Sequence, residues 1–117
     1  MKEKDCVFCK IIAGELPANF EYEDEDVVAF RDIEPSAPTH VLVIPKRHIK
    51  SLAESKDADI ELLGKIQIIA KKVAEKCNIA DGFKVVTNSG AKAGQIVHHI
   101  HYHVMGGWKK NPEKYQV

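Results

Sequence analysis

The chain has 117 residues, enough for one globular domain with its own hydrophobic core and too few for two ordinary domains. Hydrophobic residues make up 44% of it and charged residues 29%, a composition typical of a folded protein rather than a disordered one. Basic and acidic residues both number 17, so the net charge is zero and neither a nucleic acid nor a membrane surface is expected as the main partner.

Cysteine usage and the N-terminal sequence bear on the compartment. Residues 1–5 lack the apolar core of a secretory signal, and no apolar run approaches the roughly 20 residues that a membrane span needs. Three cysteines, an odd number, fit poorly with a disulfide framework. We therefore expect a cytoplasmic protein in which the motif Cys6-Val7-Phe8-Cys9 serves metal or redox chemistry.

The N-terminal part of the chain predicts a short helix followed by a β-hairpin. Residues 9–13 favour a helix that ends at Gly14, because glycine readily adopts the positive φ common at helix ends. Phe20–Glu23 and Val27–Arg31 favour two strands joined by an acidic turn over residues 24–26.

The middle of the chain predicts one buried strand and one long helix. A loop with two prolines over residues 32–38 leads into residues 39–44, whose nearly continuous apolar run favours a central strand that ends at Pro45. Ser55 or Asp57 can cap a helix that runs to about residue 77. Its apolar stripe indicates a core face rather than a cofactor site, with Cys77 as a small buried hydrophobic residue: Ile60, Leu63, Ile66, Ile69, Val73 and Cys77.

The C-terminal part predicts two further strands. Residues 83–87 favour one strand, and from His99 onward histidines alternate with apolar residues, which is the period of a half-buried strand. Ile100, Tyr102 and Val104 should face the core, and His99, His101 and His103 the opposite side. These elements predict a single α+β domain over residues 1–117, with a five-stranded antiparallel sheet, one long helix and one short helix.

The three alternating histidines cannot all serve one metal ion. At about 3.3 Å per residue, His99 and His103 lie roughly 13 Å apart along a strand, whereas zinc–nitrogen bonds are about 2.0–2.1 Å. Some of these rings must have another task, and neutral imidazole is a good nucleophile and acid–base group. The alternative, a decorated surface strand, is disfavoured because three titratable rings contribute little to packing.

Cys6 and Cys9 have the spacing of a zinc knuckle, but no second Cys-x-x-Cys follows, so any other ligands must be histidines. His48 comes just after the central strand and His99 opens the histidine strand, which makes a closed, structural Cys2His2 site consistent with the chemistry. A redox Cys-x-x-Cys is the competing interpretation, and it requires a βαβ context.

The loop over residues 88–95 contains two glycines, small side chains and one lysine. Such a composition lets main-chain N–H groups approach an anion such as phosphate, although an ordinary connection between strands fits it equally well. The phosphate interpretation gains from position, because the loop leads directly into the strand that carries a potential nucleophile.

Residues 95–107 resemble the His-x-His-x-His signature of the histidine triad (HIT) superfamily. Residues 6–12 are similar to the family's N-terminal segment, residues 29–33 to its nucleoside-contacting strand and residues 38–48 to its second hallmark. The resemblance therefore covers nearly the whole chain with four motifs in the right order, and the pair Gly106-Gly107 favours the Hint branch.

The resemblance implies an enzyme that transfers or hydrolyses a nucleotidyl group at the α-phosphorus. His101 would be the nucleophile and form a nucleotidyl-histidine, while His103 and His40 would hydrogen-bond the phosphate or the leaving group. Asp32 would hold the ribose hydroxyls. Residues near the phosphate would be Asn88, Gln95 and Ile96, and the base pocket would be lined by Val7, Phe8, Ile11, Phe30 and Ile33. In members with an N-terminal Cys-x-x-Cys, the zinc ligands match Cys6, Cys9, His48 and His99.

The implied substrates are purine nucleoside 5′-phosphoramidates, which would yield a purine mononucleotide of the AMP or GMP type, and the family's members are usually homodimers. Two alternatives stay open: a Fhit-like hydrolase of dinucleoside polyphosphates, and a zinc-stabilised nucleotide-binding or adaptor protein with little activity. Ile96 stands where Hint sequences usually carry serine, so a hydroxyl is lost there. Residues 108–117 replace the family's usual C-terminal segment, and His98 is expected to be structural.

Overall fold

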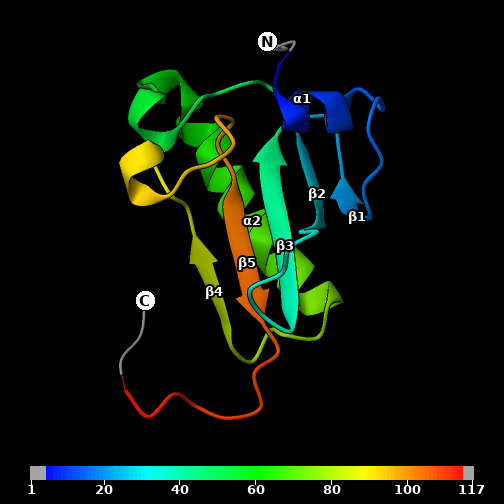
Figure 1. Ribbon diagram of the computed structural model, residues 1–117, viewed down its shortest axis with the longest axis vertical. Coiled ribbons are helices and arrows are strands. Elements are labelled where there is room, and N and C mark those ends of the chain that lie inside the picture. The colour runs from blue at the N-terminus through cyan, green and yellow to red at the C-terminus, as the bar shows by residue number, and fades with distance from the viewer. Residues whose placement is uncertain (1–4, 115–117) are drawn as a thin grey trace.

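The computed structural model describes residues 5–114, and a five-stranded antiparallel sheet lies at its centre (Figure 1). Its strands are β1 (Phe20–Glu23), β2 (Val27–Arg31), β3 (Thr39–Pro45), β4 (Phe83–Val86) and β5 (Tyr102–Gly106), in the spatial order β1-β2-β3-β5-β4. The apolar strand β3 is central, as predicted. With the helices α1 (Val7–Ile12) and α2 (Ile60–Lys76), the predicted α+β class and strand number are confirmed. Residues 1–4 and 115–117 of the predicted domain lie outside the described part.

Side chains alternate along each strand, so each face of the sheet contributes to a hydrophobic cluster of its own. On one face, α2 packs against residues of β2, β3 and β5: Val27, Ala29, Val41, Val43, Tyr102 and Val104. On the other face, α1 lies at the end of β3 that leads to Pro45 and contributes Phe8 and Cys9 to a second cluster with Val28, Phe30, Leu42 and Ile44 (Figure 1). No helix within residues 5–114 is long and apolar enough to cross a membrane.

The short helix α1 begins at Val7, two residues earlier than predicted. Cys6 is its N-cap, because the Cys6 Sγ accepts a hydrogen bond from the Cys9 N–H at 3.3 Å. The helix gives way after Ile12 to Gly14, whose φ of +80° agrees with the predicted end. The cap places both cysteines on the same helical turn.

The long helix α2 begins later than predicted, at Ile60, after a 3₁₀ turn over Asp57–Asp59. Its predicted stripe is confirmed at Ile66, Ile69 and Val73, which are buried, and wrong at Ile60, which is 67% exposed. Ile60 stands in the first turn, beyond the part of α2 that covers the sheet, where Ala70 and Ala74 complete the buried face. Cys77 is half-buried rather than buried, and its Sγ lies 3.7 Å from Arg31 Nη2.

The histidine strand β5 begins at Tyr102, so the prediction that it starts at His99 is wrong. Its partner β3 ends at Pro45, which has no N–H to extend the ladder. The Ile100 N–H instead donates to the Ile49 carbonyl, beyond β3, at 2.6 Å. The predicted alternation survives this irregularity, because Ile100, Tyr102 and Val104 all lie in the core beneath α2.

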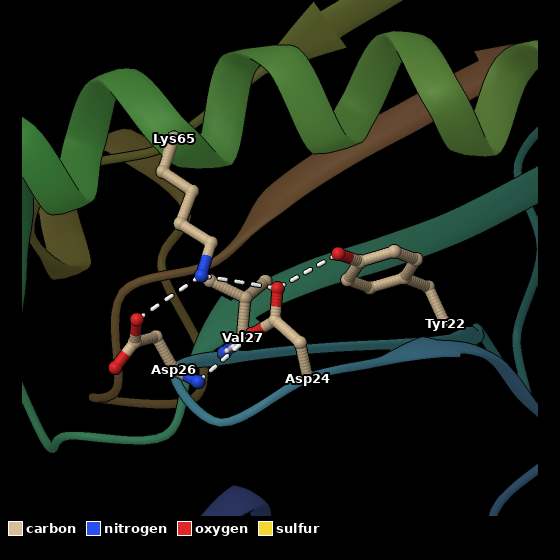
Figure 2. A network of polar contacts seen from close by, with 5 residues as sticks. All are labelled: Tyr22, Asp24, Asp26, Val27 and Lys65. Atoms are coloured by element: carbon tan, nitrogen blue, oxygen red, sulfur yellow. Dashed lines mark hydrogen bonds and ion pairs between the residues drawn. The ribbon is translucent and has the colours of Figure 1, made fainter.

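A polar network fastens the β1–β2 turn to α2 (Figure 2). The Asp24 carboxylate accepts hydrogen bonds from the Tyr22 hydroxyl at 2.7 Å and from the N–H groups of Asp26 and Val27 at 2.8 and 2.9 Å. Lys65 on α2 reaches both Asp24 and Asp26 at 3.0 Å. Lys65 thereby joins the turn to α2, and Lys76 joins β1 to the same helix through Glu21, whose main-chain carbonyl lies 2.7 Å from the Lys76 Nζ.

Candidate functional site

The strand register brings His40 and His103 together on the face of the sheet that α2 leaves open. Leu42 of β3 is directly opposite His103 of β5, and His40 lies two residues from Leu42 on the same face. The His40 Nε2 is 2.8 Å from the His103 Nδ1. Asp32, just after β2, adds a carboxylate whose Oδ2 is 3.4 Å from the same His40 Nε2.

A second group consists of the four predicted metal ligands, whose ligand atoms all lie within 4.8 Å of one another: Cys6, Cys9, His48 and His99. The His99 Nδ1 is 3.4 Å from the Cys6 Sγ, 3.6 Å from the Cys9 Sγ and 3.2 Å from the His48 Nδ1. The Cys9 Sγ is 3.4 Å from the His48 Nδ1. Neighbouring ligands of a tetrahedral zinc ion with bonds of about 2.0–2.3 Å lie roughly 3.3–3.8 Å apart, so these spacings fit one ion.

The surroundings of these ligands also fit a metal ion. The His99 Nε2–H donates to the Pro45 carbonyl at 2.8 Å, which turns the Nδ1 lone pair toward the thiols. Burial lowers the pKa of His99 to about 4, so the ring is neutral near pH 7, and burial raises the pKa of the Cys6 thiol. A cation favours thiolates here. The competing redox interpretation lacks its βαβ context, because every strand pair in the described chain is antiparallel.

Asp32, His40 and His103 also lie close enough together to suggest a metal site, but their proton positions argue against one. The Ser36 N–H donates to the His40 Nδ1 at 2.9 Å. A metal ion on the His40 Nε2 would then leave that ring with no proton, whereas histidine ligands normally donate their second N–H. This group is better suited to hydrogen bonding than to metal binding.

His101 lies between the two groups, and its Nε2 carries an unprotonated lone pair. Its Nδ1–H donates to the His99 carbonyl at 2.8 Å, which leaves the lone pair on Nε2. The centroid of its ring is 5.1 Å from that of Phe8 and 5.0 Å from that of His103. Burial lowers the pKa of His101, so the ring is neutral near pH 7. A neutral imidazole with a directed lone pair can act as a nucleophile.

The residues predicted to line a base pocket divide into a buried and an exposed set. Phe8 and Phe30 are buried with their rings edge to face at 5.5 Å, and Ile11 packs against the same cluster. Ile33 is 92% exposed and Val7 is also exposed. The structure thus brings Phe8 and Phe30 together as a buried aromatic pair and leaves the Ile33 side chain exposed on the surface.

Polar side chains of the loop over residues 88–95 bond within the loop and to the segment around residues 50–53. Gln95 accepts from the Gly90 N–H at 2.8 Å and donates to the carbonyls of Lys50 and Val97 at 2.7 and 3.1 Å. The Asn88 amide donates to the Ala93 carbonyl at 3.0 Å. Ile96 follows on the outer surface and is 87% exposed.

Next to the cysteine–histidine group, a cleft of about 420 Å³ is lined by exposed His98 and by Asp5, Cys6, Val7, His48, Lys50, Ile96 and Val97. Sequence reasoning missed Ser36, Lys50 and the Pro45 carbonyl, all of which act through main-chain atoms. The prolines around Ser36 mark a constrained loop, but no side-chain pattern reveals such contacts.

Comparisons with known proteins agree with this geometry. A family model described as "Scavenger mRNA decapping enzyme C-term binding" matches residues 5–114. Protein HitA of Neisseria gonorrhoeae is 46% identical over 102 residues, covering 87% of this chain and 95% of that protein. The "14 kDa zinc-binding protein" of Zea mays is 44% identical over 113 residues, covering 95% and 88%.

Two solved structures share the whole fold. A HIT family hydrolase from Clostridium thermocellum has a TM-score of 0.91 at 48% identity, with 96% of this chain and 98% of that one covered. A histidine triad protein from Clostridium difficile has a TM-score of 0.90 at 40% identity, with 97% and 100% covered.

Proposed function

Because the chain belongs to the histidine triad (HIT) family, we propose that it cleaves purine nucleoside 5′-phosphoramidates at the P–N bond. A hydrolase that binds nucleotides is supported at the level of the family. The observation that carries the finer proposal is the free Nε2 lone pair of His101 beside the paired rings of His40 and His103.

The reaction has two displacements at phosphorus. The His101 Nε2 forms a bond to the α-phosphorus while the P–N bond breaks, and the departing nitrogen keeps the bond's electron pair and gains a proton. Water then attacks the nucleotidyl-histidine, which releases a purine mononucleotide and restores His101. The covalent intermediate divides one difficult hydrolysis into two easier steps. His103 and His40 hydrogen-bond a phosphoryl oxygen or the departing group.

The nucleoside is held beside this centre. Asp32 binds the ribose hydroxyls, and the base lies on an apolar surface formed by Val7, Phe8, Ile11, Phe30 and Ile33. Near the phosphate, the Ile96 N–H faces the substrate, while Asn88 and Gln95 act by keeping the loop in shape, since their amides bond within it or to its neighbours.

We also propose that Cys6, Cys9, His48 and His99 hold one structural zinc ion. The ligand spacings and the hydrogen bond from His99 to Pro45 support this, as does the zinc-binding relative from Zea mays. A site closed by four protein ligands has no open position for catalysis. Its thiolates require a reducing compartment, in agreement with a cytoplasmic location. A homodimer is proposed from family membership, and light scattering measures it.

His101→Ala tests the reaction, with His98→Ala as a matched control on an exposed neighbouring histidine. We expect His101→Ala to lower phosphoramidate kcat/KM by more than about 100-fold. We also expect mass spectrometry to find a nucleotidyl adduct on the wild type and none on the variant. His98→Ala should stay near the wild type. Turnover by His101→Ala within about tenfold of the wild type would show that the nucleophile is wrong.

The lost hydroxyl at Ile96 favours one alternative, a nucleotide-binding adaptor with little activity. Tight binding of a purine mononucleotide with neither turnover nor an adduct supports that alternative. Faster turnover of diadenosine polyphosphates than of phosphoramidates supports a Fhit-like hydrolase instead.

A further inference from the structure

We propose that the Ser36 main-chain N–H fixes His40 and His103 as a one-way hydrogen-bond relay, in which His103 donates to a phosphoryl oxygen and does not protonate the leaving group. The inference rests on the proposed function for its substrate. It deepens that function by choosing between the two partners open to His103.

The direction of the relay follows from its first bond. A main-chain N–H can only donate, so the His40 Nδ1, 2.9 Å from the Ser36 nitrogen, must accept. The neutral His40 ring therefore carries its proton on Nε2, and donates it to the His103 Nδ1 at 2.8 Å. His103 in turn carries its proton on Nε2, the nitrogen left for a ligand.

Asp32 holds the relay in the same direction. Its Oδ2 lies 3.4 Å from the His40 Nε2, where a negative charge favours a proton on that nitrogen over the reversed arrangement. The Glu34 N–H donates to the Asp32 Oδ1 at 2.9 Å and keeps the carboxylate in place. A main-chain amide at one end and a carboxylate at the centre thus select the same tautomer.

The proton balance within the relay argues against an acid role for His103. If its Nε2 proton left, the protein donor hydrogen-bonded to His103 in the described structure would be the His40 Nε2–H. His40 could not then be replenished at Nδ1, because the Ser36 N–H occupies that nitrogen. His40 would become an anion beside the Asp32 carboxylate, which is unfavourable. Donation without transfer has no such cost, so His103 stabilises the negative charge that develops on a phosphoryl oxygen. The departing nitrogen takes its proton from water.

The charges around His103 agree with a neutral ring. The titratable groups that face it are His40 on β3, His101 just before β5 and Asp32 just after β2, while α1 presents the apolar Phe8 ring to His101. Burial, followed by His101 and His40, lowers the pKa of His103 to about 4, against an opposing effect of Asp32. Burial also lowers the pKa of His40.

Long-range ¹H–¹⁵N NMR of the purified protein labelled on histidine nitrogen tests the relay directly. We expect His40 and His103 to be neutral Nε2–H tautomers at pH 7. Ser36→Pro removes the donor, and Ser36 does not have the positive φ that would exclude proline. Ser36→Ala is the matched control, because it keeps the N–H.

Ser36→Pro should give His40 mixed tautomers and lower kcat/KM for a phosphoramidate by about 10–100-fold, the range seen when metal-binding histidines lose the hydrogen bond that orients them. Ser36→Ala should match the wild type in both measurements. An Nδ1–H tautomer or a charged ring at His103 in the wild type at pH 7 overturns the relay, even if Ser36→Pro fails to fold. If the tautomers are as expected but phosphoramidates are not turned over, only the proposed function is contradicted. If phosphoramidates are turned over but the tautomers differ from those expected, only the relay is contradicted.

Discussion

At the scale of single residues, main-chain partners divide the labour among the histidines. Carbonyl oxygens face the His99 Nε2 and the His101 Nδ1, so those nitrogens keep their protons and the opposite nitrogens carry lone pairs. An amide N–H faces the His40 Nδ1, so that ring becomes a donor. These contacts suit His99 to the proposed metal site, His101 to the proposed nucleophile and His40 to hydrogen-bond donation.

Ile96 offers a test at this scale, because its side chain is 87% exposed and replacing it should barely affect folding. Ile96→Ser adds a hydroxyl where the substrate phosphate is proposed to lie. One neutral hydrogen bond contributes about 0.5–1.5 kcal/mol, so we expect phosphoramidate kcat/KM to rise roughly two- to tenfold. Ile96→Ala, which removes the apolar surface without adding a hydroxyl, is the control. Equal rates for the two variants would mean that the hydroxyl has no phosphate to bind.

At the scale of elements, Asp24 is the centre of the network between the β1–β2 turn and α2 (Figure 2). Burial alone would raise its pKa, but hydrogen bonds from Tyr22, Asp26, Lys65 and Val27 outweigh this and lower the pKa well below its ordinary value. The folded state therefore binds this proton less readily than the unfolded chain does. Its contribution to stability is present above about pH 4, the unfolded pKa, and is lost as the pH falls below that.

Asp24→Asn should accordingly lower the free energy of unfolding by about 1–2 kcal/mol at pH 7. The neutral amide removes the carboxylate charge that strengthens the bonds to Lys65 and Tyr22. Urea unfolding at pH 7 and pH 3 measures this, and the difference from the wild type should shrink at pH 3. Glu25→Gln, an exposed carboxylate in the same turn, controls for the change in net charge. A stability gap that stays constant with pH would contradict the assigned direction of the pKa.

At the scale of the whole molecule, the cysteine–histidine group joins segments that are distant in sequence. Cys6 caps α1 and Cys9 lies within it, His48 follows β3, and His99 precedes β5, 93 residues from Cys6. Phe8, between the two cysteines, contacts the rings of both His99 and His101. A metal ion held by this group would therefore fix α1, and with it the Phe8 ring beside His101.

Much of this arrangement could be predicted from the sequence, and the exceptions have physical causes. The strands β1 and β2 have the predicted bounds, because alternation and an acidic turn are local signals. The four proposed metal ligands could be chosen by their chemistry, and the structure brings their ligand atoms within 4.8 Å of one another. The start of β5 could not be predicted, because it depends on Pro45 of β3, which is distant in sequence. The exposure of Ile60 could not be predicted either, because α2 extends beyond the sheet. The contact between Ser36 and His40 uses the main-chain N–H of Ser36, which almost every residue type carries. The residue type at position 36 therefore does not indicate the contact.

Removing the metal tests the largest scale. Structural zinc contributes about 10–16 kcal/mol of apparent binding free energy in small zinc domains, so even a fraction of that should lower Tm by more than about 10 °C in a chain of this size. We expect a chelator to produce this shift in calorimetry and to reduce turnover, because α1 loses its anchor beside His101. Cys9→Ser should abolish the one zinc per chain that elemental analysis is expected to find. Cys77→Ser is the matched control, because Cys77 lies outside the group and should leave the zinc in place. A chelated protein with unchanged Tm, or a Cys9→Ser variant that keeps its zinc, would show that α1 is held by packing alone.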